Sequence, residues 1–258
     1  MTTQSLPDLP LWSYPAMFGT GLTAGFVDSI AGGGGLITLP VLLSLGFPPK
    51  LALGTNKLQA TCGSGSAALH FAQSRAVSLR ECGWGLVFTG VGAAVGTLLV
   101  QQLNPNFLKQ FIPIILVTLA AYLLFRPRFG DTDVQPRLGR GVFYAVTGLG
   151  LGFYDGFLGP GTGSFWCMAF MLGLGFNMTR ATAYTKAMNF ASNLVSLIFF
   201  AVGGQVLLAA GVTMGVGQLI GAKVGSGMVL TRGTRFIRPI FITMVLAITA
   251  KLFWDSRR

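Results

Sequence analysis

Two glycine-rich stretches decide how this chain folds: GFVDSIAGGGGLITLP at residues 25–40 and GFYDGFLGPGTGSFWCM at residues 152–168. With a drift of two residues the similarity continues along the chain, and it places Asp28 on Asp155, Gly32 on Gly159, Gly35 on Gly163, and Lys57 on Lys186. Self-similarity of this kind indicates two copies of one structural unit. The sequence therefore predicts repeats at 14–125 and 142–254, joined by a polar linker at 126–141.

Each copy contains five apolar segments. The first copy has them at 14–31, 35–46, 51–73, 82–103 and 107–125, and the second at 141–158, 163–175, 181–202, 205–230 and 235–254. The second segment of each copy is about 18 Å long as a helix, too short for a hydrocarbon core of about 30 Å. We therefore expect the first two segments of each copy to form a broken or re-entrant element within an all-α polytopic membrane protein.

The composition agrees with a membrane protein. Of 258 residues, 52% are hydrophobic and only 10% charged, whereas soluble domains carry about 25% charged residues. The net charge of +11 would suggest a nucleic-acid partner in a soluble protein. Here most arginines lie in short loops between apolar segments, where they orient a protein in the membrane. We expect a lipid bilayer as partner, no nucleic acid and no cofactor. The three cysteines lack metal-ligand spacing, so we interpret them as small packing residues.

The arginines also predict how the copies are oriented. If the first two segments form a hairpin, each copy crosses the membrane an odd number of times and the copies are inverted. One side then receives the loop with Arg75 and Arg80, the linker and Arg180, and the other the N-terminus and Lys50. Parallel copies would separate the 75–80 loop from the linker. Basic loops stay cytoplasmic, so we expect an outside N-terminus and a cytoplasmic linker, although the basic residues at 251–258 then lie outside.

Inverted repeats with broken helices are typical of secondary transporters. Ionisable side chains inside apolar segments are costly unless they are paired, hydrated or functional, and this chain has five: Asp28, Lys57, Asp155, Lys186 and Lys223. The repeated lysines lie among donors that suit an anion, namely Asn56, Gln59, Thr185 and Asn189. Two interpretations stay open: the lysines bind an anionic substrate, or each reaches an interface or pairs with a neighbouring aspartate to hold helices together.

The glycine breaks support an anion site, because glycine leaves backbone N–H groups bare at a helix N-terminus, where the dipole favours negative charge. We name as candidates the breaks at Gly33, Gly34, Gly35, Gly161 and Gly163. Their alternative role is a tight turn, and both roles are compatible.

Three further residues have two possible roles. Asp28 and Asp155 precede the breaks by four residues; they could carry a coupled proton, and a structural role on the freed backbone or on a lysine is favoured slightly. His70 could relay protons, although a lone histidine is more often a packing residue. No catalytic triad, metal cluster or close carboxylate pair appears at catalytic spacing, which argues against an enzyme.

The residues also carry a resemblance. GFVDSIAGGGGLITLPVLLSLGFPPKLALGTNKLQAT at 25–61 resembles the N-terminal signature of the sulfite exporter TauE/SafE family, also called the 4-toluene sulfonate uptake permease family. GFYDGFLGPGTGSFWCMAFMLGLG at 152–175 and ATAYTKAMN at 181–189 are similar to its second signature. The resemblance implies a multi-pass permease of the bacterial inner membrane for small sulfur-containing or organosulfonate anions, and family members differ in substrate and in direction.

Both lines of argument predict a transporter that carries a small anion by alternating access, with a proton as possible coupling ion. An anion channel, or a transporter of another small organic anion, is the alternative. The glycine pairs Gly92/Gly96 and Gly221/Gly225 would allow close helix contact either within one chain or in a homodimer.

Overall fold

The computed structural model describes residues 9–232 except 79, 109, 113, 115–117 and 119–131. Its helices are α1 (Ser13–Ala31), α2 (Gly35–Ser44), α3 (Pro49–Gln73), α4 (Gly83–Gln102), α6 (Arg140–Phe157), α7 (Thr162–Leu174), α8 (Met178–Val202) and α9 (Leu208–Arg232). No strand occurs in the described part of the chain, and the all-α prediction is confirmed. Of the predicted fifth segments, 235–254 lies wholly and 107–125 largely outside the described residues.

The first element of each half is broken at its glycines, as predicted. α1 ends at Ala31 and α2 begins at Gly35, while α6 ends at Phe157 and α7 begins at Thr162. Gly32 and Gly161 have φ angles of 74° and 77°, a left-handed region that glycine adopts without strain. α2 and α7 have 10 and 13 residues, so neither spans a bilayer as a straight helix.

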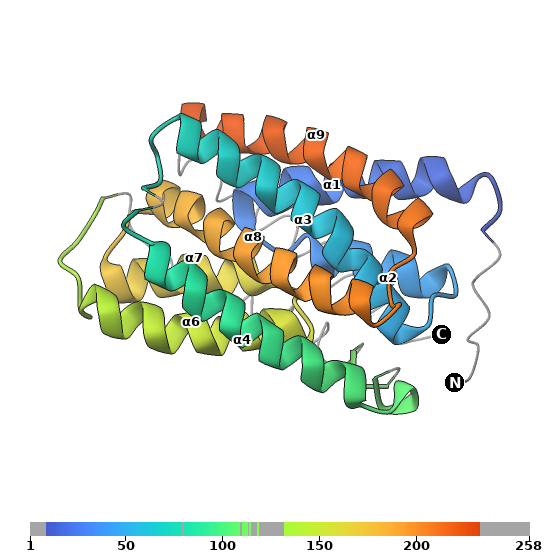
Figure 1. The fold of residues 1–258 in the computed structure, drawn as a ribbon. Coiled ribbons are helices and arrows are strands. Elements are labelled where there is room, and N and C mark those ends of the chain that lie inside the picture. Colours follow the sequence, from blue (N-terminus) through green and yellow to red (C-terminus); the bar gives the residue numbers. More distant parts are fainter. Residues whose placement is uncertain are drawn as a thin grey trace.

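The helices of the two halves run in opposite directions. α3 and α8 lie side by side in the middle of the bundle, and Gly54 lies near Phe200 while Gly65, further along α3, lies near Phe190. α1, α3 and α9 run one way, and α4, α6 and α8 the other (Figure 1). The described helices α1, α3 and α4 are therefore antiparallel to α6, α8 and α9, which hold the corresponding places in the second half.

Glycines bring the outer helices into close contact across the halves. A Cβ at Gly96 of α4 would overlap the carbonyl oxygen of Phe153 on α6, and one at Gly221 of α9 would overlap that of Leu22 on α1. Both pairs of small residues identified in the sequence are thus used inside one chain, and α1 packs along α9 as α6 packs along α4.

The apolar surface agrees with a membrane environment. Within the described residues, α4, α8 and α9 are long and apolar enough to cross a membrane, and α2 and α7 are shorter apolar helices. Val87, Val91 and Val95 form an exposed ridge along α4, a position that lipid tails can cover.

Two ion pairs attach the linker to one end of the bundle. Arg140 Nη1 lies 3.1 Å from Glu81 Oε2 in the α3–α4 connection, and Arg180 Nη1 lies 3.0 Å from Asp133 Oδ2. The basic residues described at this end are Arg75, Arg80, Arg137, Arg140, Arg180 and Arg232, and the opposite end has Lys50 at the start of α3. The described cations are therefore strongly segregated between the two ends.

Candidate functional site

The two glycine breaks meet in the centre of the bundle. A Cβ at Gly32 would lie 2.5 Å from the backbone nitrogen of Ser164, and one at Gly35 would lie 3.3 Å from Cα of Pro160. Only glycine permits the first of these approaches, because a Cβ so close to backbone would have to displace it. The N-termini of α2 and α7 are thereby brought together, one from each half.

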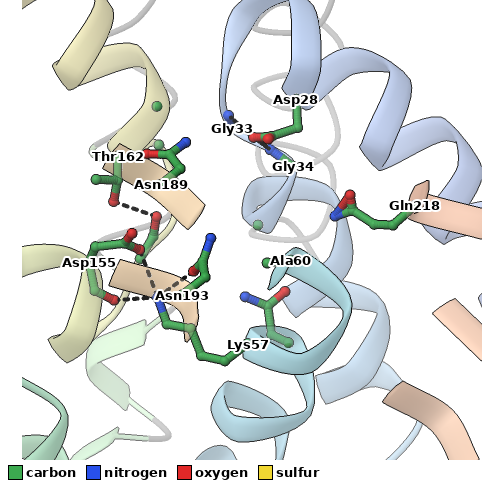
Figure 2. A pocket seen from close by; sticks show the side chains of 15 residues that line it. Asp28, Gly33, Gly34, Lys57, Ala60, Asp155, Thr162, Asn189, Asn193 and Gln218 are labelled. Carbon is green, nitrogen blue, oxygen red and sulfur yellow. Dashed lines mark hydrogen bonds and ion pairs between the residues drawn. The ribbon is translucent and has the colours of Figure 1, made fainter. Parts of the chain in front are cut away.

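A small polar cavity lies at this crossing (Figure 2). The volume that the centres of water-sized molecules can reach is about 30 Å³, and a single water needs about 10–15 Å³. The cavity thus has room for about two waters. Its lining comprises Asp28, Gly33, Gly34, Gly35, Asn56, Lys57, Ala60, Asp155, Gly159, Gly161, Thr162, Gly163, Asn189, Asn193 and Gln218.

Lys57 of α3 forms an ion pair with Asp155 of α6. Its Nζ lies 2.7 Å from Asp155 Oδ1 and 2.6 Å from the Asp155 carbonyl oxygen, and it also donates to Asn193 Oδ1 at 3.0 Å. The exposed fractions of the two side chains are 2% and 4%. A charge pair buried this deeply is kept only with such further hydrogen bonds.

Lys186 of α8 forms the corresponding pair with Asp28 of α1. Its Nζ lies 2.9 Å from Asp28 Oδ2 and also contacts the Asp28 carbonyl oxygen. Asp28 Oδ1 accepts hydrogen bonds from the backbone N–H groups of Gly33 and Gly34, each at 3.0 Å. Asp28 therefore satisfies the backbone freed by the first break, the structural role that the sequence favoured slightly.

The lysine–aspartate pairs join the two halves. Each lysine binds the aspartate of the other half and not the aspartate of its own, so two ion pairs connect the halves at the crossing. Of the two interpretations of the lysines, the structure displays the pairing with an aspartate.

The surroundings of the two carboxylates differ. Asp155 Oδ2 accepts a hydrogen bond from the Ser192 hydroxyl, and Ser192 Oγ also lies 3.1 Å from the carbonyl oxygens of Met188 and Asn189. In the alignment that places Lys57 on Lys186, an offset of 129 residues, the first half has Gly63 in place of Ser192. The Asp155 site therefore contains a hydroxyl that its counterpart lacks.

The other predicted site residues divide into two groups. Asn56 and Asn189 line the cavity together with the predicted glycines, while Lys186, Gln59 and Thr185 are absent from its described lining. Gln59 Nε2 instead donates to Asn56 Oδ1 at 2.7 Å. Within the described structure, Asn189 Oδ1 and Thr185 Oγ1 are buried without a hydrogen-bond partner.

His70 lies away from the cavity. Its Nδ1 lies 2.8 Å from Ser226 Oγ on α9, and it is absent from the described lining. Lys223 is exposed on the surface of α9. Among the described residues no group of three His, Cys, Asp or Glu side chains lies close enough to hold a metal.

The candidate list from the sequence did not include several residues at the site, among them Ser192, Asn193 and Gln218. The first two could have been found from helical spacing, because positions three and four residues after Asn189 lie on its face of α8. Gln218, 2% exposed, is one of the few polar residues of a largely apolar segment, and the sequence gives no other indication of its place at the site.

Comparison with known proteins gives relatives that are described as probable membrane transporters. A Haemophilus influenzae protein described as a probable membrane transporter protein is 46% identical over 240 residues, covering 93% of this chain and 94% of the relative. The probable membrane transporter protein YfcA of Escherichia coli is 43% identical over 240 residues, covering 93% and 89%. YunE of Bacillus subtilis, also described as a probable membrane transporter protein, is 24% identical over 266 residues, covering 92% and 96%.

No solved structure gives a significant match to this chain. Residues 17–252 match the family described as sulfite exporter TauE/SafE. This range of residues includes both glycine breaks and both lysine–aspartate pairs. The resemblance noted in the two signatures is thereby confirmed, and the chain belongs to the TauE/SafE sulfite exporter family of membrane proteins.

Proposed function

We propose that this protein is a secondary transporter for small sulfur-containing or organosulfonate anions, and that the anion binds where the two glycine breaks cross. The observation that carries the proposal is the Asp155 carboxylate on Lys57: an anionic group already lies against a buried ammonium at the end of a broken helix. A sulfonate presents the same chemistry, because its oxygens accept hydrogen bonds and carry negative charge.

The broken helices favour an anion at this place. The first N–H groups of a helix have no partner within it, and the helix dipole adds positive potential there. α2 and α7 both begin at the cavity wall, at Gly35 and Thr162. The N–H groups of Gly33 and Gly34 already bond Asp28, so the helix starts contribute positive potential, and the Lys57 ammonium and the amide groups of Asn189 and Asn193 offer the donors for one small anion.

The arrangement of the halves supports alternating access. Halves of opposite direction can exchange conformations, so that a site between them opens first to one side and then to the other. In the present conformation the site has room for only about two waters. A substrate must therefore enter while the protein is in another conformation, in which the site is open. The segregated arginines support a cytoplasmic linker and an outside N-terminus in the inner membrane of a bacterium.

The test is a binding screen on the purified protein with methanesulfonate, 4-toluenesulfonate, sulfite, thiosulfate, sulfoacetate and taurine. The key variant is Lys57→Met/Asp155→Asn, which removes both charges and so leaves no unpaired charge in the core. We expect it to lose binding at least tenfold, while Lys223→Met, which removes an exposed lysine of α9, binds as the parent does. If the double variant bound these anions as tightly as the parent, the proposed site would be wrong. If the parent bound none of them, the proposed function would be wrong.

Flux measurements separate the transporter from the channel alternative. In proteoliposomes a transporter gives saturable uptake that is accelerated by unlabelled substrate inside, because the loaded site returns faster. Uptake that is not saturable and shows no such exchange would identify a channel instead.

A further inference from the structure

The two lysine–aspartate pairs occupy equivalent places but differ in what a proton would meet there. Every hydrogen-bond partner that the structure gives the Asp28 carboxylate is a donor: two backbone amides on Oδ1 and the Lys186 ammonium on Oδ2. A protonated carboxyl group must itself donate a hydrogen bond. Asp28 has no acceptor for that bond among these partners, so its surroundings stabilise the charged form.

Asp155 has a partner that can change roles. A hydroxyl group both donates and accepts, and Ser192 Oγ lies 3.1 Å from two backbone carbonyl oxygens, those of Met188 and Asn189. Its hydrogen can turn to either carbonyl, which leaves the Ser192 oxygen free to accept a hydrogen bond from protonated Asp155. Both protonation states of Asp155 are thus satisfied by the same side chain.

The cavity faces the pair that contains Asp155. Lys57 and Asp155 both line it, whereas only Asp28 of the other pair does, and Lys186 is not among the described lining residues. The three N–H groups of Lys57 meet three acceptors: the carboxylate and carbonyl oxygens of Asp155 and the amide oxygen of Asn193. An anion that binds Lys57 must therefore displace one of them, and the carboxylate is the competitor with the same charge.

Charge balance then requires a proton. The buried site holds two lysines and two aspartates and has no net charge, and an added anion would leave one unpaired negative charge in a medium of low dielectric constant, which is strongly unfavourable. We propose that Asp155 accepts one proton when a monoanion replaces it on Lys57, so that one proton accompanies each anion. The proton is released by a buffer acid of the aqueous solution, whose conjugate base stays in solution, and it forms an O–H bond at Asp155 Oδ2, while the Lys57–Asp155 ion pair gives way to a Lys57–anion pair.

This inference rests on the proposed function and narrows its substrate class to monoanions. A dianion would leave one negative charge uncompensated even after Asp155 is protonated. Lys57 would then hold the substrate, Asp155 would hold the proton, and the Lys186–Asp28 pair would stay intact as a fixed link between the halves.

The charged and titratable groups around Asp155 are few in the described structure. Lys57 faces it from α3, and the Lys186–Asp28 pair lies at the same crossing of the breaks. Its neighbour Tyr154 donates its hydroxyl hydrogen to the Pro160 carbonyl oxygen at 2.6 Å. The side chains from the other elements around it are uncharged: Ser192 and Asn193 of α8, Thr162 of α7, Gln218 of α9, and Thr97 of α4, which bonds Gly156 beside it.

The test counts protons during binding. Isothermal titration of the parent with 4-toluenesulfonate is carried out at one pH in Tris and in imidazole, because the difference in heat between buffers gives the number of protons taken up. Sulfonate buffers are avoided since they are possible ligands. We expect uptake of about one proton per bound anion, and an affinity that falls about tenfold for each unit by which the pH is raised. Binding of 4-toluenesulfonate without proton uptake would overturn the inference and leave the proposed function standing.

The variants assign the proton to a residue. Asp155→Asn imitates the protonated carboxyl group, so it should bind 4-toluenesulfonate with no proton uptake and an affinity independent of pH. Asp28→Asn is the matched control, and its proton count should stay near one. The opposite assignment, with uptake lost in Asp28→Asn and kept in Asp155→Asn, would overturn the proposal, as would tighter binding of the dianion sulfoacetate than of 4-toluenesulfonate.

Ser192 supplies a further test that does not alter the charges. Ser192→Ala should keep one proton per anion but bind at lower pH than the parent, because the Asp155 proton loses its acceptor, and Ser192→Thr should restore the parent profile. A pH profile of Ser192→Ala identical to that of the parent would remove Ser192 from the proposal. Complete absence of binding by the parent with every anion of the screen would instead refute the proposed function itself.

Discussion

The ammonium of Lys57 on α3 lies 2.7 Å from the carboxylate of Asp155 on α6, a residue of the other half of the chain. Both side chains are almost completely buried, so bulk water solvates neither charge. Because a buried charge without its partner is costly, this contact makes the two halves depend on each other.

A double-mutant cycle on this pair should show strong coupling. We expect Lys57→Met alone to lower the free energy of unfolding by about 3–5 kcal/mol, since Asp155 is left buried and unpaired. Adding Asp155→Asn should recover part of that loss. Thermal unfolding in detergent measures the effect, and strictly additive single effects would show that the pair contributes no mutual stabilisation.

The exposed ion pairs of the linker should behave in the opposite way. The side chains of Arg180 and Asp133 are 35% and 43% exposed, and surface pairs contribute about 0–1 kcal/mol because water and salt screen them. Arg180→Met should therefore change stability by less than about 1 kcal/mol, apart from lost packing on Phe176, whose ring centroid lies 4.1 Å from Cζ of Arg180. A loss as large as that of Lys57→Met in the same unfolding assay would contradict this difference.

The crossing of the breaks should tolerate no side chain. A Cβ at Gly163 would lie 2.9 Å from Asn189 Nδ2 and 2.9 Å from Gly32 Cα, so Gly163→Ala should push the two breaks apart and reduce uptake at least tenfold. Gly150→Ala is the matched control, because nothing lies within 4 Å of a Cβ at that position on α6. Uptake by both variants at the parent rate would show that the close approach is not needed.

The orientation can be tested by thiol labelling of a cysteine placed in the linker, such as Pro136→Cys. We expect a reagent that cannot cross membranes to label it only when the cytoplasmic side is accessible. Burial raises the pKa of the Cys82 thiol to about 11, so at pH 7 it stays protonated and gives little background, which should increase only as the pH approaches that value. Labelling of residue 136 in intact cells would place the linker outside.

The sequence predicted the helices well because their signals are local. Apolar runs and glycine breaks placed α1 and α7 within one residue of their observed starts, Ser13 and Thr162. The presence of a lysine and an aspartate in each copy was equally visible.

The pairing of each lysine with the aspartate of the other half was not predictable in the same way. Asp28 and Lys57 belong to the same copy, and only the way the helices of the two halves are arranged around the crossing decides that each lysine meets the other aspartate. Helical spacing places Ser192 on the same face of α8 as Asn189, but its bond to Asp155 was not predictable, because Asp155 lies on another helix.

The crossed pairs also bear on how such a chain could arise. Each half supplies one lysine and one aspartate at matching places, so two separate copies of a single half, packed antiparallel, would form the same two bonds without any covalent connection. The linker would then only join the two copies. In a homodimer formed by an ancestral single half, the two lysines and two aspartates at the centre would already have had no net charge. A chain cut within 132–139 and produced as two fragments should reassemble, because each fragment alone would carry a buried lysine and a buried aspartate whose partners reside on the other.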